Sequence, residues 1–189
     1  MSLNKKQIAE VTERIGKPMS DSDLDKYTGV KATDIIKYSD LDEYKTIDDL
    51  LPTNKSFRII LLEESYNEGH WVAIMKYGNT VEYFNSYGTA PDYDWRFINR
   101  MVRVVLGQST NELTRLMKQA DEVGYEAIYN KRDFQKHSPE VQTCGRWVVL
   151  RIEMMRMGYD LKQFIEFIDD LCEKTKQSTD FVVSLLVSK

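Results

Sequence analysis

Nucleophilic chemistry has few candidate residues in this chain, because its 189 residues include only two cysteines and two histidines. Cys144 ends a polar stretch and precedes a largely apolar one, with Gly145 directly after it. A thiol at the start of a helix lies beside free backbone amides and the positive end of the helix dipole, and both favour the thiolate. We therefore predict that Cys144 is a nucleophile, and we expect Gly145 to leave space beside its sulfur for a substrate carbonyl.

His70 is the matching candidate for a general base, because it lies just before a predicted strand and is flanked by Gly69 and Trp71. A histidine within hydrogen-bond reach of a thiol activates the thiol and later protonates the leaving group. We expect Trp71 either to pack beside the His70 ring or to be an ordinary core residue. A buried structural cysteine and a structural histidine are the alternative to this pair.

The other cysteine and the other histidine are weaker candidates. Cys172 lies in the middle of a predicted helix, which is typical of a structural thiol. His137 lies in a predicted polar loop, where we expect neither a strand nor a partner to fix its ring. A zinc site built from His70, His137, Cys144 and Cys172 is the metal alternative, but the spacings fit no standard zinc pattern. We therefore predict neither a metal nor a cofactor.

The pattern of apolar residues predicts the elements that must position these side chains. Aromatic and β-branched residues predict a hairpin over 71–77 and 80–87, joined by Gly78-Asn79, a favoured two-residue turn. The apolar segment 145–157 predicts a buried central helix that begins next to Cys144. We predict irregular structure for 28–55 and a surface loop for 130–143. The remaining predicted helices cover 4–16, 20–27, 95–106, 111–120 and 161–173, the remaining strands cover 57–62 and 126–129, and 180–187 is a helix or an edge strand.

These elements predict an α+β fold in which a small central β-sheet is flanked by helices. At the usual ~150 residues per domain, the chain is expected to form a single domain over 1–189. Its 30 acidic and 26 basic residues give a net charge of −4, which argues against a generic nucleic-acid binder. Arg96, Arg100 and Arg103 fall near one face of the predicted helix over 95–106, and a solvated basic face is the default interpretation.

Nothing in the sequence resembles a targeting or membrane-spanning segment. Residues 1–16 are rich in charge and lack the apolar core of a signal peptide. The apolar runs are far shorter than the ~20 residues that a spanning helix needs. We therefore expect an intracellular protein, cytoplasmic or virion-associated, in a reducing compartment that keeps Cys144 and Cys172 as thiols.

Four stretches follow one another along the chain: GHWVAIMK at 69–76, VEYFNSYG at 81–88, a glutamine-containing loop, and TCGRWVVLR at 143–151. Taken together, they resemble the adenovirus-type proteases and the proteases specific for ubiquitin-like proteins such as SUMO. That clan of cysteine proteases has a papain-like architecture in permuted order: histidine, then an acidic residue or asparagine, then glutamine, then cysteine. The resemblance covers about residues 57–157 and is nearest to the adenain-like proteases of large DNA viruses.

The resemblance implies a role for each matched residue. Cys144 would be the nucleophile, and His70 would be the general base and then the general acid. Asn85, within FNSYG, stands where the clan more usually has Asp or Glu; an asparagine can fix the imidazole tautomer but supplies no charge. Glu82 is the rival for this place, and strand alternation puts Glu82 and Asn85 on opposite faces, so only one can point at His70.

The resemblance also implies an oxyanion hole formed by the backbone N–H of Cys144 and a glutamine side-chain amide. Gln135 and Gln142 are the two candidates, and two ordinary loop glutamines are the alternative. We favour Gln135, because Gln142 lies too close to Cys144 along the chain to fold back over the sulfur.

The function implied is that of a cysteine endopeptidase working through a Cys-His-Asn triad and an acyl-enzyme. Its partner would be a protein or peptide substrate, with viral precursor proteins cut near small residues in a narrow cleft walled by Trp71 and Trp147. The alternatives are an isopeptidase acting on ubiquitin-like proteins, an acyltransferase of the same clan that uses acetyl-CoA, and an inactive binding module. The oligomeric state is open.

Overall fold

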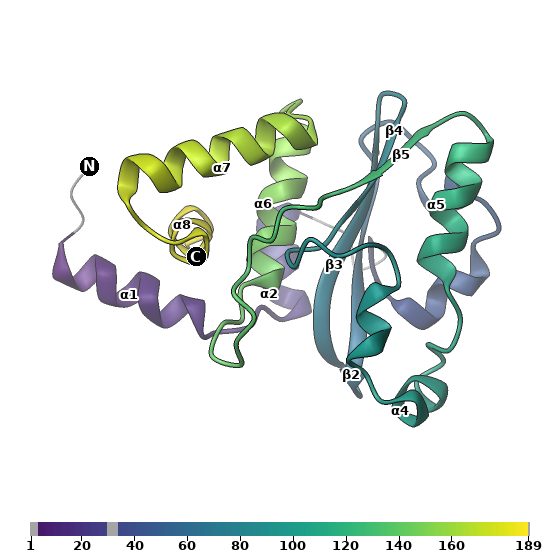
Figure 1. The fold of residues 1–189 in the computed structure, drawn as a ribbon, viewed down its shortest axis with the longest axis horizontal. Coiled ribbons are helices and arrows are strands. Elements are labelled where there is room, and N and C mark those ends of the chain that lie inside the picture. The colour runs from purple at the N-terminus through teal and green to yellow at the C-terminus, as the bar shows by residue number, and fades with distance from the viewer. Residues whose placement is uncertain (1–3, 30–33, 189) are drawn as a thin grey trace.

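The structure, a computed structural model, describes residues 4–29 and 34–188 (Figure 1). Five strands form one sheet in the order β1-β2-β3-β4-β5. Strands β2, β3 and β4 are antiparallel neighbours, while β1 and β5 pair in parallel at the two edges. The strands are β1 (Ile35–Lys37), β2 (Phe57–Ser65), β3 (Glu68–Tyr77), β4 (Thr80–Phe84) and β5 (Glu126–Tyr129).

Helices cover both faces of this sheet, so the predicted α+β class is confirmed (Figure 1). One side holds α1 (Lys5–Ile15), α2 (Asp21–Thr28), α6 (Cys144–Arg156), α7 (Leu161–Thr175) and α8 (Thr179–Leu186). The other side holds η2 (Tyr38–Glu43), α3 (Ile47–Leu50), η3 (Tyr93–Arg96), α4 (Arg100–Val105) and α5 (Glu112–Glu122). None of the helices in the described part of the chain is long and apolar enough to cross a membrane.

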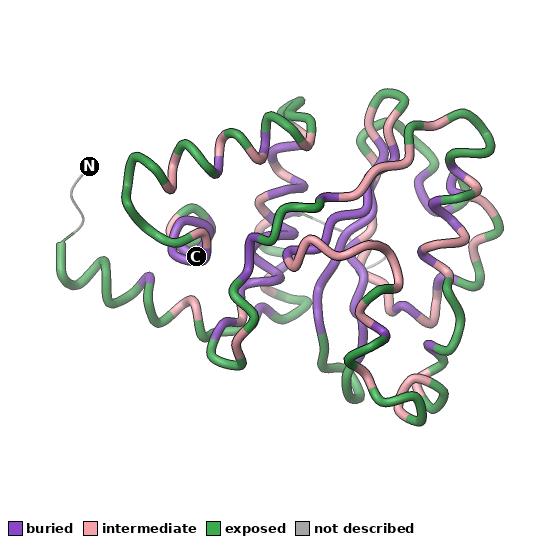
Figure 2. Tube along the Cα trace, viewed as in Figure 1, coloured by how far each residue is buried: buried purple, intermediate pink, exposed green. Residues whose placement is uncertain are grey.

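The central strands are apolar on both faces because each face packs against helices. Along β2, Ile59 and Leu61 belong to the core on the α6 side, and Ile60 and Leu62 belong to the core on the α5 side. Figure 2 shows the resulting buried band running through the sheet and α6. The ends of β3 and of α6 are therefore held rigidly, and the candidate nucleophile and base lie at those ends.

Helix α6 is the buried central helix that the apolar segment predicts. Trp147 is fully buried and stacks on Phe134, with ring centroids 4.8 Å apart, and its edge meets Phe164. The expectation that Trp147 forms a wall of a substrate cleft is therefore wrong, because the residue lies in the core. Trp147 shares this core with residues of α6, α7 and α8 and does not line the cleft that Cys144 faces.

The hairpin prediction is confirmed at its turn and wrong at its far end. Tyr77 pairs with Thr80, so Gly78 and Asn79 form the two-residue turn, and Gly78 has the positive φ of +55° that such a turn uses. However, β4 ends at Phe84 rather than at 87. The chain turns there because the backbone N–H of Gly88 donates to the carbonyl of Asn85 at 2.8 Å.

Two stretches on the α5 side depart from the sequence prediction. Residues 30–33 of the segment 28–55 lie outside the described part of the chain, and residues 34–55 are not irregular, since they contain β1, η2 and α3. These elements have three to six residues, too few to show a hydrophobic period, and they form because Tyr38, Leu41 and Ile47 are buried against the sheet. The helix expected over 95–106 is split into η3 and α4, since the Asn99 side chain accepts from the N–H of Met101 and begins a new helix.

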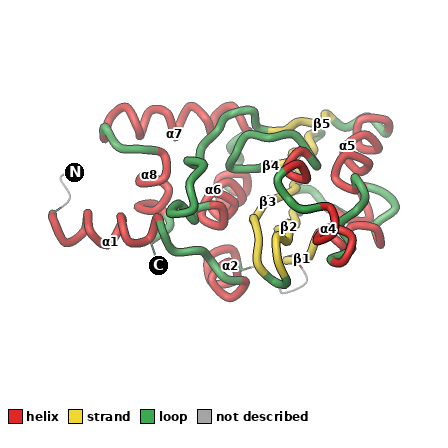
Figure 3. The backbone as a smooth tube through the Cα atoms, turned by 60° about the horizontal axis from the view of Figure 1, so that its bottom comes forward, coloured by secondary structure: helices red, strands yellow, loops and turns green. Residues whose placement is uncertain are grey.

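Two later stretches are also settled by packing. Segment 130–143 is only partly a surface loop: it runs from β5 back across to α6 (Figure 3), and Asn130, Phe134 and Gln135 are buried along the way. Residues 180–186 lie in helix α8 and Val187 caps its end, so the edge-strand alternative is wrong. Ser178 caps α8 by accepting from the N–H of Phe181, and the helix is largely buried, which removes any amphipathic signal.

Candidate active site

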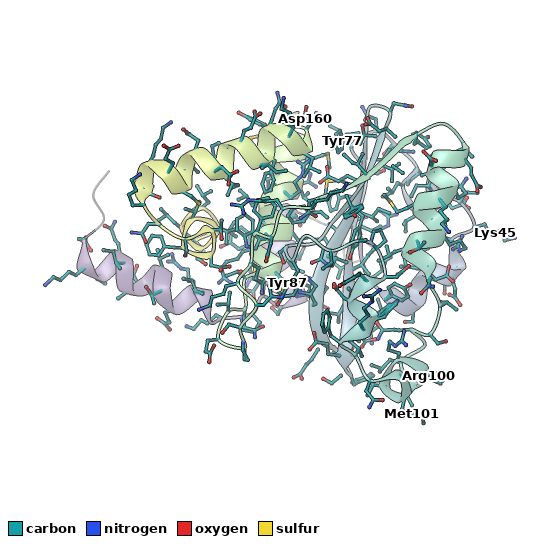
Figure 4. The ribbon with its side chains drawn as sticks, viewed as in Figure 1. Lys45, Tyr77, Tyr87, Arg100, Met101 and Asp160 are labelled. Carbon is teal, nitrogen blue, oxygen red and sulfur yellow. The ribbon has the colours of Figure 1, made fainter. Side chains whose placement is uncertain are left out.

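A cleft of about 1320 Å³ lies between the two halves of the molecule, at the end of the sheet where β3 begins. The 16–23 segment and the 135–144 segment line one side of it, and the β2–β3 hairpin with parts of 87–98 lines the other. His70, Cys144 and Gln135 all face this cleft. Figure 4 labels Tyr87, which also lines the cleft and lies where the chain crosses between the halves.

Cys144 is the first residue of α6, and its thiol and the His70 ring lie close enough to shift each other's pKa. Burial raises the pKa of Cys144, but the hydrogen bond and charge of His70, together with the backbone N–H groups of Trp71 and Gly145, lower it below its ordinary value. Burial lowers the pKa of His70, but the hydrogen bond and charge of Cys144 outweigh it and raise that pKa to about 9. The pair is thus arranged to hold a thiolate beside an imidazolium.

Gly69 explains why His70 can occupy the start of β3. His70 pairs with Leu62 across the β2–β3 ladder. A Cβ atom at position 69 would lie 1.9 Å from the carbonyl oxygen of Leu62, so only glycine fits there. The Gly-His-Trp sequence therefore has a structural cause: glycine allows the strands to meet, and His70 is placed at the mouth of the cleft.

Asn85 lies behind His70 and is completely buried. The amide oxygen of Asn85 is 2.8 Å from Nε2 of His70 and also accepts from the N–H of Tyr87 at 3.0 Å. An amide oxygen accepts only, so Nε2 carries the proton and Nδ1 is the nitrogen left for Cys144. The backbone of Asn85 is held by the Asn130 side chain, which donates to its carbonyl and accepts from its N–H.

Glu82 faces the opposite side of β4, as the alternation of the strand predicts. Its carboxylate accepts from Nε and Nη2 of Arg151 on α6 at 2.8 and 2.7 Å, and from the hydroxyl of Tyr77. Both side chains of the ion pair are fully buried. Glu82 is therefore occupied in the core, and Asn85 is the residue of the two that reaches His70.

Gln135 and Gln142 both line the cleft but are held differently. The Gln135 side chain is buried; its oxygen accepts from Ser86 at 2.8 Å, and its Nε2 donates to the Val141 carbonyl at 3.1 Å and to the Tyr87 hydroxyl at 3.2 Å. The Gln142 side chain is half-buried and donates to the carbonyl of Pro139. Gln135 is thus fixed against the loop that follows β4.

Asp180 is a residue of this region that the sequence does not single out. One oxygen of its buried carboxylate accepts from the hydroxyl of Thr143 at 2.6 Å, and the other accepts from the backbone N–H of Lys136 at 3.0 Å. Asp180 thereby ties the residue before Cys144 to the residue after Gln135. Its sequence position, in the first turn of a helix, is an ordinary place for an acid and gives no sign of this role.

Tyr87 and His137 were also not identified as a pair by the sequence. The Tyr87 ring stacks on the His70 ring, with centroids 4.6 Å apart. The same Tyr87 ring also contacts the His137 ring, with centroids 4.2 Å apart. The expectation that His137 lacks a partner is wrong, because its Nε2 is 3.2 Å from a carboxylate oxygen of Asp133. His137 is more than half exposed and is not the histidine bonded to Cys144.

Met19 corrects the expectation for Gly145 and gives Trp71 a partner. A Cβ atom at position 145 would lie 2.9 Å from Cβ of Met19, so Gly145 makes room for the 16–20 segment rather than for open space. The indole N–H of Trp71 donates to the Met19 carbonyl at 2.9 Å. Trp71 and Met19 thus form part of the cleft wall next to Cys144.

The remaining candidates lie apart from the cleft pair. Cys172 is on α7, partly buried, and burial raises the pKa of its thiol. Within residues 4–29 and 34–188, no group of three or more His, Cys, Asp or Glu side chains is placed to hold a metal ion. Arg96 is on η3 and covers the Tyr93 ring, whereas Arg100 and Arg103 are on α4, so the expected basic helix face is divided between two elements.

Comparison with known proteins gives one related sequence and two solved structures whose fold is distantly similar. No protein-family model matches the chain. The chain is 33% identical to the uncharacterized protein V9 of the Sputnik virophage over 154 residues, which are 81% of this chain and 85% of that protein.

Two solved structures of the SUMO protease Ulp1 resemble the fold. The first, with the catalytic cysteine oxidized to a sulfinic acid, has a TM-score of 0.41 and 14% identity over 99% of this chain and 95% of that chain. The second is the C-terminal protease domain in complex with Smt3, the yeast orthologue of SUMO; it has a TM-score of 0.38 and 14% identity over 99% and 96% of the two chains.

Proposed function

We propose that this chain, which belongs to the same family as the virophage protein V9, is a cysteine peptidase that cleaves protein substrates through an acyl-enzyme on Cys144. The observation that carries the proposal is the buried series Cys144, His70, Asn85, in which Cys144 and His70 shift each other's pKa and His70 is hydrogen-bonded to Asn85, and which opens on a cleft of about 1320 Å³. A thiolate paired with an imidazolium, whose second nitrogen is held by an amide oxygen, is the arrangement that acyl transfer by a cysteine requires.

The proposed reaction begins with the Cys144 proton on Nδ1 of His70. The thiolate attacks the scissile carbonyl carbon and a C–S bond forms. As the C–N bond breaks, His70 gives its proton to the leaving amine. Water then adds to the thioester, with His70 taking a proton from it, and the C–S bond breaks to release a carboxylic acid and the free thiol.

The proposed oxyanion hole uses the backbone N–H of Cys144 and Nε2 of Gln135. Both hydrogens of that Nε2 are bonded, to the Val141 carbonyl and, at the longer distance of 3.2 Å, to the Tyr87 hydroxyl. A substrate oxygen would take the place of the Tyr87 hydroxyl, while the bond to Val141 keeps the amide oriented. Such a donor acts on the charge that develops in the transition state.

The proposed substrate is a precursor protein cut beside small residues. Support for small residues comes from Trp71 and Met19, which stand next to Cys144 in the cleft and narrow it. Support for a viral precursor comes from the related protein, which belongs to a virophage.

The test is covalent labelling with a peptide that ends in Gly-Gly vinyl sulfone, together with hydrolysis of a matching fluorogenic peptide. We expect labelling of the wild type at Cys144, and loss of both labelling and hydrolysis in Cys144→Ala and His70→Ala. Cys172→Ala is the matched control and should behave as wild type. Equal labelling of wild type and His70→Ala, or labelling at Cys172, would contradict the proposal; turnover only with acetyl-CoA would indicate an acyltransferase.

A further inference from the structure

Asp94, on η3, reaches the side of Asn85 that faces away from His70. Its Oδ2 accepts from the amide nitrogen of Asn85 at 2.6 Å, and its Oδ1 accepts from the Thr89 hydroxyl at 2.9 Å. The Thr89 hydroxyl also accepts from the same amide nitrogen, at 2.7 Å. The Asn85 amide therefore lies between an imidazole on its oxygen side and a carboxylate on its nitrogen side.

This arrangement determines which way the Asn85 amide points. The carboxylate of Asp94 can only accept, so it requires the NH₂ group of the amide, and the N–H of Tyr87 can only donate, so it requires the oxygen. A flipped amide would face Asp94 with an oxygen and His70 with N–H groups. His70 would then hold its proton on Nδ1 and could not accept the proton of Cys144.

The charge of Asp94 also supplies what an asparagine lacks. Its negative charge raises the pKa of His70, after the larger influences of burial, Cys144 and the Asn85 hydrogen bond. Two phenols also feel this carboxylate, Tyr83 on β4 and Tyr87, and burial raises the pKa of both, so they stay neutral. Asp94 is thus the charged group behind the amide that holds His70.

We propose that Asp94 is a positioning residue that acts through Asn85, fixing the amide orientation and delivering a carboxylate charge to the far side of His70. The inference rests on the proposed function of the Cys144–His70 pair and adds a fourth member to it. The clan position usually filled by an acid is divided here into two residues, with an amide from the end of β4 and a carboxylate from η3.

The position of Asp94 is itself fixed by the chain around it. Asp92, two residues earlier, accepts from the Tyr38 hydroxyl at 2.7 Å and from the N–H of Thr114 near the start of α5 at 2.7 Å. Asp92 has a positive φ of +62°, which turns the chain into η3. The loop therefore presents Asp94 to Asn85 from a rigid support.

The experiment compares four variants: Asp94→Ala, Asp94→Asn, Asn85→Asp, and the double variant N85D/D94N. Each is measured for kcat and KM on the fluorogenic peptide against pH, and for the pH dependence of iodoacetamide alkylation at Cys144. Asp170→Asn, an exposed acid on α7, is the control and should match wild type. Thermal unfolding of each variant shows that it is folded.

We expect Asp94→Ala to lower kcat by between about tenfold and the ~10⁴-fold loss that follows from a wrong histidine tautomer, with little change in KM. Asp94→Asn keeps an acceptor for the Asn85 amide but removes the charge, so it should lose less activity. Its upper pH limit should move down, because removing a negative charge lowers the pKa of His70. Asn85→Asp places two carboxylates against each other and should be severely impaired, whereas N85D/D94N restores one acid and one amide and should recover activity.

Unchanged kcat and pH limits in both Asp94 variants, or a double variant no better than N85D, would overturn the inference. A purely structural role for Asp94 does not predict recovery in the double variant. If the wild type fails to cleave peptides but Asp94→Asn still shifts the alkylation profile of Cys144, the proposed function falls and the positioning role stands. If the wild type is active and the Asp94 variants leave kcat, the pH limits and the alkylation profile unchanged, the proposed function stands and the positioning role of Asp94 falls.

Discussion

At the level of single residues, the buried pair of Cys144 and His70 shows opposite pKa shifts with a common cause. The hydrogen bond and mutual charge favour the ionised form of each partner, and they outweigh the burial that disfavours both. The ion pair exists above the lowered pKa of Cys144 and below the His70 pKa of about 9. The raised pKa of His70 stabilises the folded state. This contribution to the free energy of unfolding is complete below pH ~6.5, the ordinary histidine pKa, and is lost as the pH rises through about 9.

Gln135 and Gln142 are held by different hydrogen bonds, so we expect alanine substitutions at these two residues to affect kcat differently. Gln135→Ala removes the buried amide that points along the cleft wall, so kcat should fall by about 10²–10³-fold, as for other oxyanion donors, with KM nearly unchanged. Gln142→Ala removes only a half-buried contact with Pro139 and should stay near wild type. Steady-state kinetics on the fluorogenic peptide measure both. The assignment is wrong if the larger loss follows from Gln142→Ala.

At the level of elements, α8 acts on the site without lining the cleft beside Cys144. Asp180 holds Thr143 and Lys136, and the hydroxyl of Thr179 donates to the carbonyl of Phe134. The start of α6 and the segment that carries Gln135 are therefore both fastened to the first turn of α8. This fastening replaces a side-chain cap on α6, because the Thr143 hydroxyl is given to Asp180 instead.

Asp180→Ala is expected to weaken both the fold and the site. It leaves the Thr143 hydroxyl and the Lys136 N–H without their buried acceptor, at a cost of about 1–3 kcal/mol for each unpaired group. The free energy of unfolding in urea measures this loss, and kcat should fall as well because Cys144 and Gln135 lose a shared support. Ser184→Ala, one turn further along α8, removes a buried hydroxyl that has no partner in the described structure and should leave both quantities nearly unchanged. Equal effects of the two variants would exclude the fastening role.

At the level of the whole molecule, the ion pair of Glu82 and Arg151 joins the sheet to the helices on the α6 side. Glu82 comes from β4, Arg151 from α6, and the Tyr77 hydroxyl from β3 completes the contact. Because α6 carries Cys144 and β3 carries His70, this contact also fixes the two halves of the site relative to each other. Outer features such as Arg100 and Met101 on α4 project from the far end of the molecule (Figure 4) and take no part in it.

Breaking the Glu82–Arg151 pair should destabilise the molecule strongly. Arg151→Met leaves a buried carboxylate without its partner, and we expect a loss of about 3–5 kcal/mol in the free energy of unfolding. The double variant E82L/R151M replaces both charges with apolar groups and should recover most of that loss. Lys174→Ala, which breaks an exposed pair with Asp170, is the control and should have little effect. A double variant as unstable as Arg151→Met would show that the charges themselves are needed.

Much of this fold was predictable because its signals are local. The apolar segment places α6, the Gly78-Asn79 turn between aromatic and β-branched residues places the β3–β4 hairpin, and strand alternation correctly separates Glu82 from Asn85. The elements that were missed, β1 and α3, are too short to carry a period and exist because the sheet buries them. The helix over 95–106 was wrong because Asn99 begins a second helix where the apolar pattern runs on unbroken.

The sequence by itself determined the candidate pair, its order along the chain, and the helix start at Cys144, since these depend on residue type and on neighbours a few positions away. Only the tertiary structure decided which groups stand behind that pair. Asp94 meets Asn85 across a loop, Asp180 meets Thr143 from a later helix, and Trp147 is turned into the core. Hydrogen-bond partners and packing faces depend on distances in space between residues far apart in the chain, and the side chains involved have no pattern of their own that reveals them.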